Sequence, residues 1–171
     1  GLDRIDFTRS PEPARLEEAI RFALVRGFSV VVKPHLEPGI YKGIDPARPD
    51  NPSWRVACPW RGWFDVDAMS PAYADGVVRS TLQVIARAMR AARRRRLPPV
   101  RFDLGSELMN SVVEKPERWV SLLNLARREV TALGMTGQVL LSHNFSHHIM
   151  IPEDEVLRMA APRRRVLGRY V

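Results

Sequence analysis

Short apolar stretches typical of β-strands alternate along this chain with longer segments of helical periodicity. Strands are expected at residues 4–7, 28–33, 100–107 and 138–143. After them come segments whose apolar residues recur every three or four positions, at residues 11–26, 71–92, 116–133 and, more weakly, 152–159. Because a strand that follows a crossover helix runs parallel to the strand before it, the sequence predicts an α/β fold with a parallel sheet.

Serine, proline and glycine mark the expected helix ends. Ser10 and Ser70 each precede a proline, as a helix cap followed by proline in the first turn would, and Gly27 and Gly134 stand where helices should stop. Residues 109–115 are expected to form a short loop. No linker or low-complexity segment divides residues 1–171, so they are expected to form a single domain.

Two architectures fit a regular βα series: an open doubly wound sheet, or part of a (β/α)8 TIM barrel. No Gly-x-Gly-x-x-Gly follows the first strand and no Gly-Lys-Ser/Thr occurs, which disfavours dinucleotide and phosphate-loop binding, and no cofactor is expected. A complete barrel needs about 250 residues, so four βα units would make about half of one.

The net charge of +8 would ordinarily favour a nucleic-acid partner. The arginines are scattered over all segments, however, and the densest run, Arg93–Arg96, follows a helix, where cations interact favourably with the carboxyl-terminal end. A nucleic-acid-binding module is therefore the less favoured reading. No apolar run approaches 18 residues, so no membrane partner is expected. The single cysteine excludes an internal disulfide.

One carboxylate stands out because of its place at the end of a strand. Regular alternation over residues 100–107 would put Arg101, Asp103, Gly105 and Glu107 on one face, with Glu107 at the carboxyl end. Functional groups of parallel α/β folds gather at that end, although an exposed loop glutamate is the alternative. Asp103, about 13 Å further down the strand, is interpreted as structural and paired with Arg101 or Lys33.

Three motifs together resemble glycoside hydrolase family 113, the endo-β-1,4-mannanase-like family of clan A. They are Lys33-Pro34-His35, the Trp60-Arg61-Gly62-Trp63-Phe64 segment of the long connection 36–70, and Gly105-Ser106-Glu107-Leu108. The resemblance runs from about Ser10 to Ser146 and corresponds to the second to fifth βα units of that family's TIM barrel. It implies that the chain forms about half of such a barrel.

The resemblance also implies a retaining hydrolase of β-1,4-linked glycans such as mannan. Glu107 would be the general acid/base, and the nucleophile would come from the seventh barrel strand, outside this chain. The substrate, a polysaccharide or oligosaccharide, would contact Trp60, Arg61, His35, Lys33, Trp63 and Asn144. Flat indole rings stack on the apolar faces of sugars, although these tryptophans could instead cap the core.

Two further interpretations stay open. A non-catalytic carbohydrate-binding or inactive scaffold is possible because half a barrel exposes two sheet edges, which the remainder of the barrel or a partner chain must cover. A metal site at His143, Asn144, His147 and His148 is disfavoured, because neither a cysteine cluster nor a His-Glu-x-x-His motif accompanies these residues.

Overall fold

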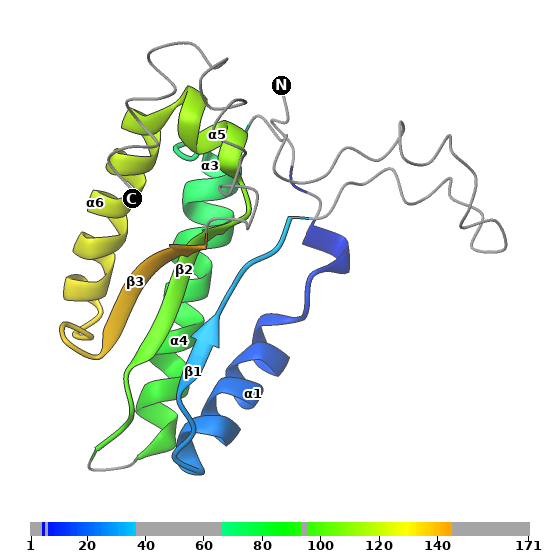
Figure 1. The fold of residues 1–171 in the computed structure, drawn as a ribbon. Coiled ribbons are helices and arrows are strands. Elements are labelled where there is room, and N and C mark those ends of the chain that lie inside the picture. The colour runs from blue at the N-terminus through cyan, green and yellow to red at the C-terminus, as the bar shows by residue number, and fades with distance from the viewer. Residues whose placement is uncertain (1–4, 6, 37–65, 94–95, 145–171) are drawn as a thin grey trace, which may run out of the picture.

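The described part of the chain forms a three-stranded parallel sheet with helices packed against it (Figure 1). The computed structural model describes residues 5, 7–36, 66–93 and 96–144. The strands are β1 (Val30–Val32), β2 (Val100–Ser106) and β3 (Val139–Asn144), in the order β1-β2-β3. Val31 pairs with Arg101, which in turn pairs with Leu140. The predicted α/β fold with a parallel sheet is confirmed.

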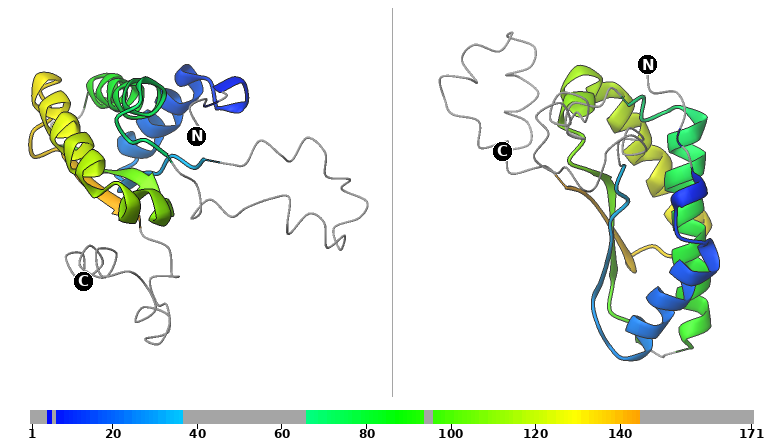
Figure 2. Two further views of the ribbon diagram at one scale, coloured as in Figure 1. Left: turned by 90° about the horizontal axis from the view of Figure 1, so that it is seen from above. Right: turned by 90° about the vertical axis from the view of Figure 1, so that its right-hand side faces the viewer.

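The three long helices all lie on the same face of this sheet (Figures 1 and 2). They are α1 (Pro13–Val25), α4 (Ser80–Ala92) and α6 (Pro116–Ala132). In the described residues no helix covers the opposite face, which is called the open face below. Sequential strand order with one-sided helices is the pattern of singly wound βα units, whereas a doubly wound sheet carries helices on both faces.

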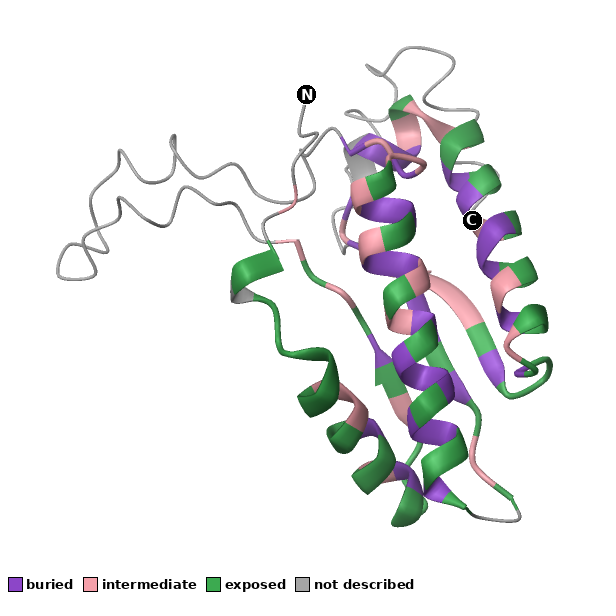
Figure 3. Cartoon of the chain, turned by 180° about the vertical axis from the view of Figure 1, so that it is seen from behind, coloured by how far each residue is buried: buried purple, intermediate pink, exposed green. Residues whose placement is uncertain are grey.

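The hydrophobic core lies between the sheet and the helices, where Figure 3 shows buried residues on the inner sides of α4 and α6. Phe102 and Val100 of β2 are fully buried. The predicted apolar stripe of the helix before β2 is confirmed, because all its members are buried: Val78, Leu82, Ile85, Ala86 and Met89. Leu122, Ala126 and Val130 form the corresponding buried face of α6.

The helix that precedes β2 is continuous but not uniform. It begins as α3 (Pro71–Tyr73), passes through a π-helical segment, Ala74–Arg79, and continues as α4. The side chain of Ser70 accepts a hydrogen bond from the Tyr73 N–H at 3.3 Å, which confirms the predicted cap. The helix ends at Ala92, and its C-cap residue, Arg93, is exposed, as is Arg96, whereas Arg94 and Arg95 lie outside the described residues.

Several predicted boundaries were wrong. The strand expected at 28–33 is limited to Val30–Val32, and Val31 is 54% exposed because no described element covers the open face. α1 begins at Pro13, not directly after Ser10. Phe7 belongs to a 3-10 helix, Phe7–Arg9, and not to a strand. The rest of the strand expected at 4–7 lies almost entirely outside the described residues, and the helix expected at 152–159 lies wholly outside them.

The loop expected at residues 109–115 is instead a short helix, α5 (Met109–Glu114). Its buried residue Ser111 donates a hydrogen bond to the backbone carbonyl of Val66 and accepts one from Trp119 Nε1 at 2.9 Å. Val112 is buried beside it. These contacts come from segments distant in sequence, so local patterning gave no sign of the helix.

Candidate functional site

A shift in strand register sets which side chains reach the open face. The pairing of β2 with β3 is irregular between Asp103 and Ser106. Asp103 contacts Lys33 and Ser106 contacts His35, and these partners lie two residues apart beyond β1, on the same face of an extended chain. Asp103 and Ser106 therefore share the open face although they are three residues apart. The regular alternation expected from the sequence, which placed Ser106 on the other face, was wrong.

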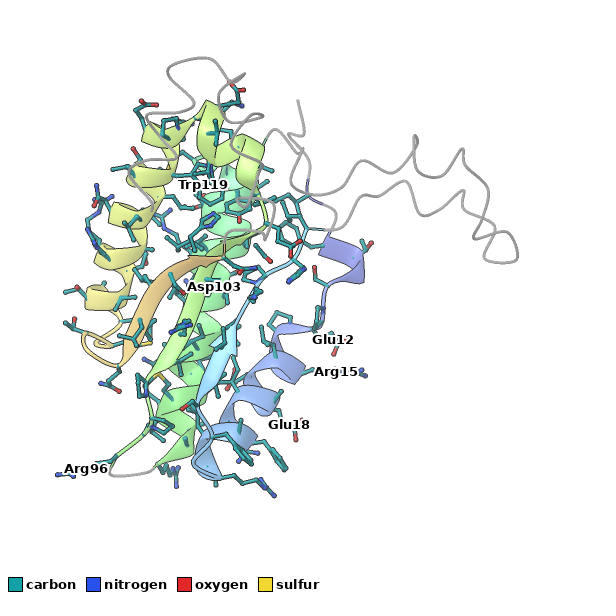
Figure 4. The ribbon with its side chains drawn as sticks, in the orientation of Figure 1. Glu12, Arg15, Glu18, Arg96, Asp103 and Trp119 are labelled. Carbon is teal, nitrogen blue, oxygen red and sulfur yellow. The ribbon has the colours of Figure 1, made fainter. Side chains whose placement is uncertain are left out.

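The lower polar row on the open face consists of Lys33, Asp103 and Ser142, one residue from each strand or its extension. Lys33 Nζ lies 3.9 Å from Asp103 Oδ2, and the Ser142 hydroxyl donates to Asp103 Oδ1. Asp103, labelled in Figure 4, is only 5% exposed. A buried carboxylate with a cation and a hydroxyl as partners is a structural group, so the expected pairing of Asp103 with Lys33 is confirmed.

The upper polar row lies nearer the carboxyl ends of the strands and consists of His35, Ser106 and Asn144. Ser106 Oγ is 3.0 Å from His35 Nε2 and accepts a hydrogen bond from Asn144 Nδ2 at 3.4 Å. Ser106 is buried, with 1% of its surface exposed, whereas His35 is exposed. The row thus links the ends of all three strands through one buried hydroxyl.

Glu107 follows directly after the upper polar row, where β2 ends. Its φ of 59° lies in the left-handed region, which costs a non-glycine residue roughly 1 to 2 kcal/mol. The Glu107 N–H donates to the Asn144 carbonyl at 2.8 Å, so the end of β3 holds this backbone in place. The residue is half-buried. A costly conformation held by a neighbouring strand is typical of functional positions.

An aromatic cluster supports β2 from the helix side. Trp119, labelled in Figure 4, lies edge-on to Tyr73 and His143, with ring centroids 5.6 and 4.9 Å away. The Tyr73 hydroxyl donates to the Leu104 carbonyl at 2.8 Å, and burial raises the pKa of Tyr73. A Cβ atom on Gly105 would lie 2.8 Å from the Trp119 ring, so only glycine allows β2 to approach this closely.

His143 should make stability fall at acidic pH. Its ring nitrogens are buried, and burial lowers the pKa of His143 from 6.5 to about 4, although Asp103 and the Asn144 backbone act in the opposite direction. Between about pH 6.5 and 4 the unfolded chain gains a proton that the folded chain does not. The free energy of unfolding should therefore decrease as the pH is lowered, by up to about 1.4 kcal/mol per pH unit.

Urea unfolding of the protein and of His143→Gln at several pH values measures this contribution. The variant should have a shallower pH dependence than the wild type over this interval, because it lacks the titrating ring. Equal slopes for the two proteins would contradict a neutral, buried His143.

The residues proposed from the sequence fall into three groups. His35, Asn144 and Glu107 lie together at the carboxyl ends of the strands, and Lys33 lies one row below. Trp60, Arg61 and Trp63 lie outside the described residues. Sequence reasoning assigned no role to Ser106, because the register shift that turns it to the open face has no recognised sequence signal.

Neither a metal cluster nor a membrane span emerges from the described ranges. Within them, no group of three or more histidine, cysteine, aspartate or glutamate side chains could hold a metal ion. None of the described helices is long and apolar enough to cross a bilayer.

Comparison of the chain with protein-family models, with curated proteins and with solved structures gives no match.

Proposed function

We propose that this chain is the Glu107-bearing part of a retaining glycoside hydrolase that cleaves β-1,4-linked glycans such as mannan. The observation that carries the proposal is the placement of Glu107. It is half-buried and directly follows the central parallel strand at its carboxyl end, and the residue before it, Ser106, contacts the side chains of His35 and Asn144. This end of a parallel βα series is where substrates bind in barrel enzymes.

General acid/base catalysis would suit a carboxyl group at this position. The leaving glycosidic oxygen must receive a proton, so the acid needs a defined direction. The left-handed backbone of Glu107 and the hydrogen bond from its N–H to the Asn144 carbonyl hold the backbone from which such an acid would project.

A second carboxylate is required as nucleophile, about 5 to 5.5 Å from the first in retaining enzymes. Asp103 is unsuited to this role, because it is buried and engaged by Lys33 and Ser142. We infer that the nucleophile belongs to a later barrel strand, contributed by further chain or by a partner chain. The same strands would cover the sheet edges at β1 and β3 and the exposed Val31 and Leu140 of the open face.

Substrate binding is assigned to groups around Glu107. The His35 ring and the Asn144 amide can hydrogen-bond to sugar hydroxyls from the two flanking strands. Trp60 and Trp63 would stack on sugar rings, and Arg61 would bond to hydroxyls, as the resemblance implies. Lys33 contributes mainly by holding Asp103, since their charged groups lie 3.9 Å apart.

The proposal is tested by incubating the full-length protein with a panel of β-1,4-glycans, including mannan, glucomannan and cellulose oligosaccharides, and measuring the release of reducing ends. We expect hydrolysis of at least one of them, with the β-anomer as the first product, because a retaining mechanism preserves the anomeric configuration. Binding of the same glycans without any release of reducing ends would contradict the enzyme and support a non-catalytic carbohydrate-binding scaffold.

A further inference from the structure

The upper polar row has a defined hydrogen-bond direction because Ser106 is buried. The amide nitrogen Asn144 Nδ2 can only donate a hydrogen bond, so Ser106 Oγ is the acceptor in this contact. The Ser106 hydroxyl hydrogen must then find an acceptor, since an unsatisfied buried donor is costly. Among the described residues, its remaining partner is His35 Nε2, at 3.0 Å.

This direction determines the state of the His35 ring. If Nε2 accepts the Ser106 hydrogen, Nε2 carries no hydrogen, and a neutral imidazole must then carry its hydrogen on Nδ1. The opposite arrangement, with Nε2–H donating to Ser106, would leave the buried hydroxyl hydrogen without an acceptor. The row therefore runs from the Asn144 amide through the Ser106 hydroxyl to His35 Nε2.

We propose that Ser106 is a positioning residue that holds His35 as the Nδ1–H tautomer and directs this N–H toward a sugar hydroxyl of the substrate. His35 is exposed, and within the described part of the chain its ring has one hydrogen-bond partner, Ser106, so Nδ1–H faces the space outside the row. The assignment of the substrate rests on the proposed function, whereas the assignment of the tautomer rests only on the row itself.

The consequence is a fixed hydrogen-bond donor at the end of β2, the strand that Glu107 directly follows. A histidine that can exchange between tautomers offers either a donor or an acceptor to a ligand, but a histidine with a fixed tautomer offers only a donor. The Nδ1–H of His35 would therefore bind a substrate oxygen, whose lone pairs accept the hydrogen bond. Because Ser106 and Glu107 are consecutive in the chain, the donor and the acid are tied to the same strand end.

Nitrogen-15 NMR of the histidine rings in the free protein, at mildly alkaline pH, tests the tautomer directly. Protonated and unprotonated ring nitrogens of imidazole have well separated resonances, and the signals of His35 among the four histidines are identified by their loss in His35→Gln. We expect a protonated Nδ1 and an unprotonated Nε2. A protonated Nε2 in the wild-type protein would overturn the proposal, whatever the variants do.

Two variants test the direction of the row. Ser106→Ala removes the hydroxyl, so His35 should become a mixture of tautomers. Asn144→Asp reverses the row: the new carboxylate accepts the Ser106 hydrogen, Ser106 Oγ then accepts from Nε2, and the ring should change to the Nε2–H tautomer. Ser142→Ala is the matched control, because it removes a hydroxyl from the lower polar row that contacts Asp103, and it should leave His35 unchanged. An unchanged His35 spectrum in Ser106→Ala and Asn144→Asp would refute the proposed direction.

Steady-state kinetics of the Ser106 variants then test whether the tautomer of His35 affects hydrolysis of the substrate. Ser106→Ala should lower kcat/KM on the hydrolysed glycan by about threefold to tenfold, the effect of one misdirected hydrogen bond, and Ser106→Thr should restore it. The tautomer is measured without any glycan, so an inactive protein with Nδ1–H His35 would contradict only the proposed function. An active protein with an Nε2–H ring would contradict only the role of Ser106.

Discussion

Glu107→Gln should lower turnover of the natural glycan by about 100-fold or more while leaving the fold and glycan binding intact. The amide is nearly isosteric with the carboxyl group, so it keeps the half-buried site at the end of β2 filled. It cannot, however, deliver a proton to the leaving oxygen. Steady-state kinetics on the glycan identified in the panel, with binding measured by calorimetry, separate the loss of turnover from any loss of affinity.

Aryl glycosides sharpen this test because their leaving groups need no protonation. Their first step should survive in Glu107→Gln, and release of the glycosyl-enzyme should become limiting, since water then lacks its general base. A burst of aryl alcohol followed by slow turnover is expected, and added azide should restore turnover because an anionic nucleophile needs no base. Equal, small effects on glycan and aryl substrates would remove Glu107 from the catalytic role.

A matched control comes from another glutamate of the same chain. Glu117 lies exposed in the first turn of α6 and takes no part in either polar row. Glu117→Gln removes the same charge from the protein, and its rates should stay within about twofold of the wild type. A comparable fall in both variants would indicate a general effect of charge and not an acid at the site.

Trp119→Ala should reduce the free energy of unfolding by about 3 to 5 kcal/mol, the largest stability effect that we expect from this chain. The indole is 5% exposed, contacts the rings of Tyr73 and His143, and donates from Nε1 to Ser111. Its loss leaves a cavity behind β2 and leaves Ser111 with one partner fewer. Urea unfolding gives the difference directly from the transition midpoint and slope.

Trp119→Phe is the control for this prediction. It keeps an aromatic ring against Tyr73 and His143 but removes the hydrogen bond to Ser111, so it should cost only about 1 to 2 kcal/mol. The two variants separate ring packing from the hydrogen bond. A loss below about 1 kcal/mol in Trp119→Ala would show that the cluster does not support the sheet.

Gly105 lies between the aromatic cluster on the helix side of β2 and the upper polar row on the open face. On one side, a side chain at Gly105 would collide with Trp119 and His143, and on the other, the next residue, Ser106, faces His35 and Asn144. The packing on the helix side therefore sets the position of the polar row on the open side. We expect Trp119→Ala to impair activity as well as stability, since it removes the support behind this point.

Local patterns in the sequence were sufficient for the strands β1, β2 and β3, the long helices α1, α4 and α6, and their order. Helical spacing identified Val78, Leu82 and Ile85 as one buried face, because periodicity depends only on residues of the same helix. The cap at Ser70 and the left-handed Gly27, with a φ of 83°, were also predictable, since both reflect local backbone chemistry. The place of Glu107 at the end of a strand followed from the same patterns.

The tertiary structure alone decided the place of Ser106 between His35 and Asn144. Alternation along residues 100–107 assumes a regular strand, whereas the shift between Asp103 and Ser106 arises in the pairing of β2 with β3. That shift turns Ser106 toward His35, which lies beyond the end of β1 and 71 residues earlier in the chain. The helix α5 likewise depends on contacts of Ser111 with Val66 and Trp119. Side-chain spacing within one segment cannot report such features, because their energies come from segments that meet only after folding.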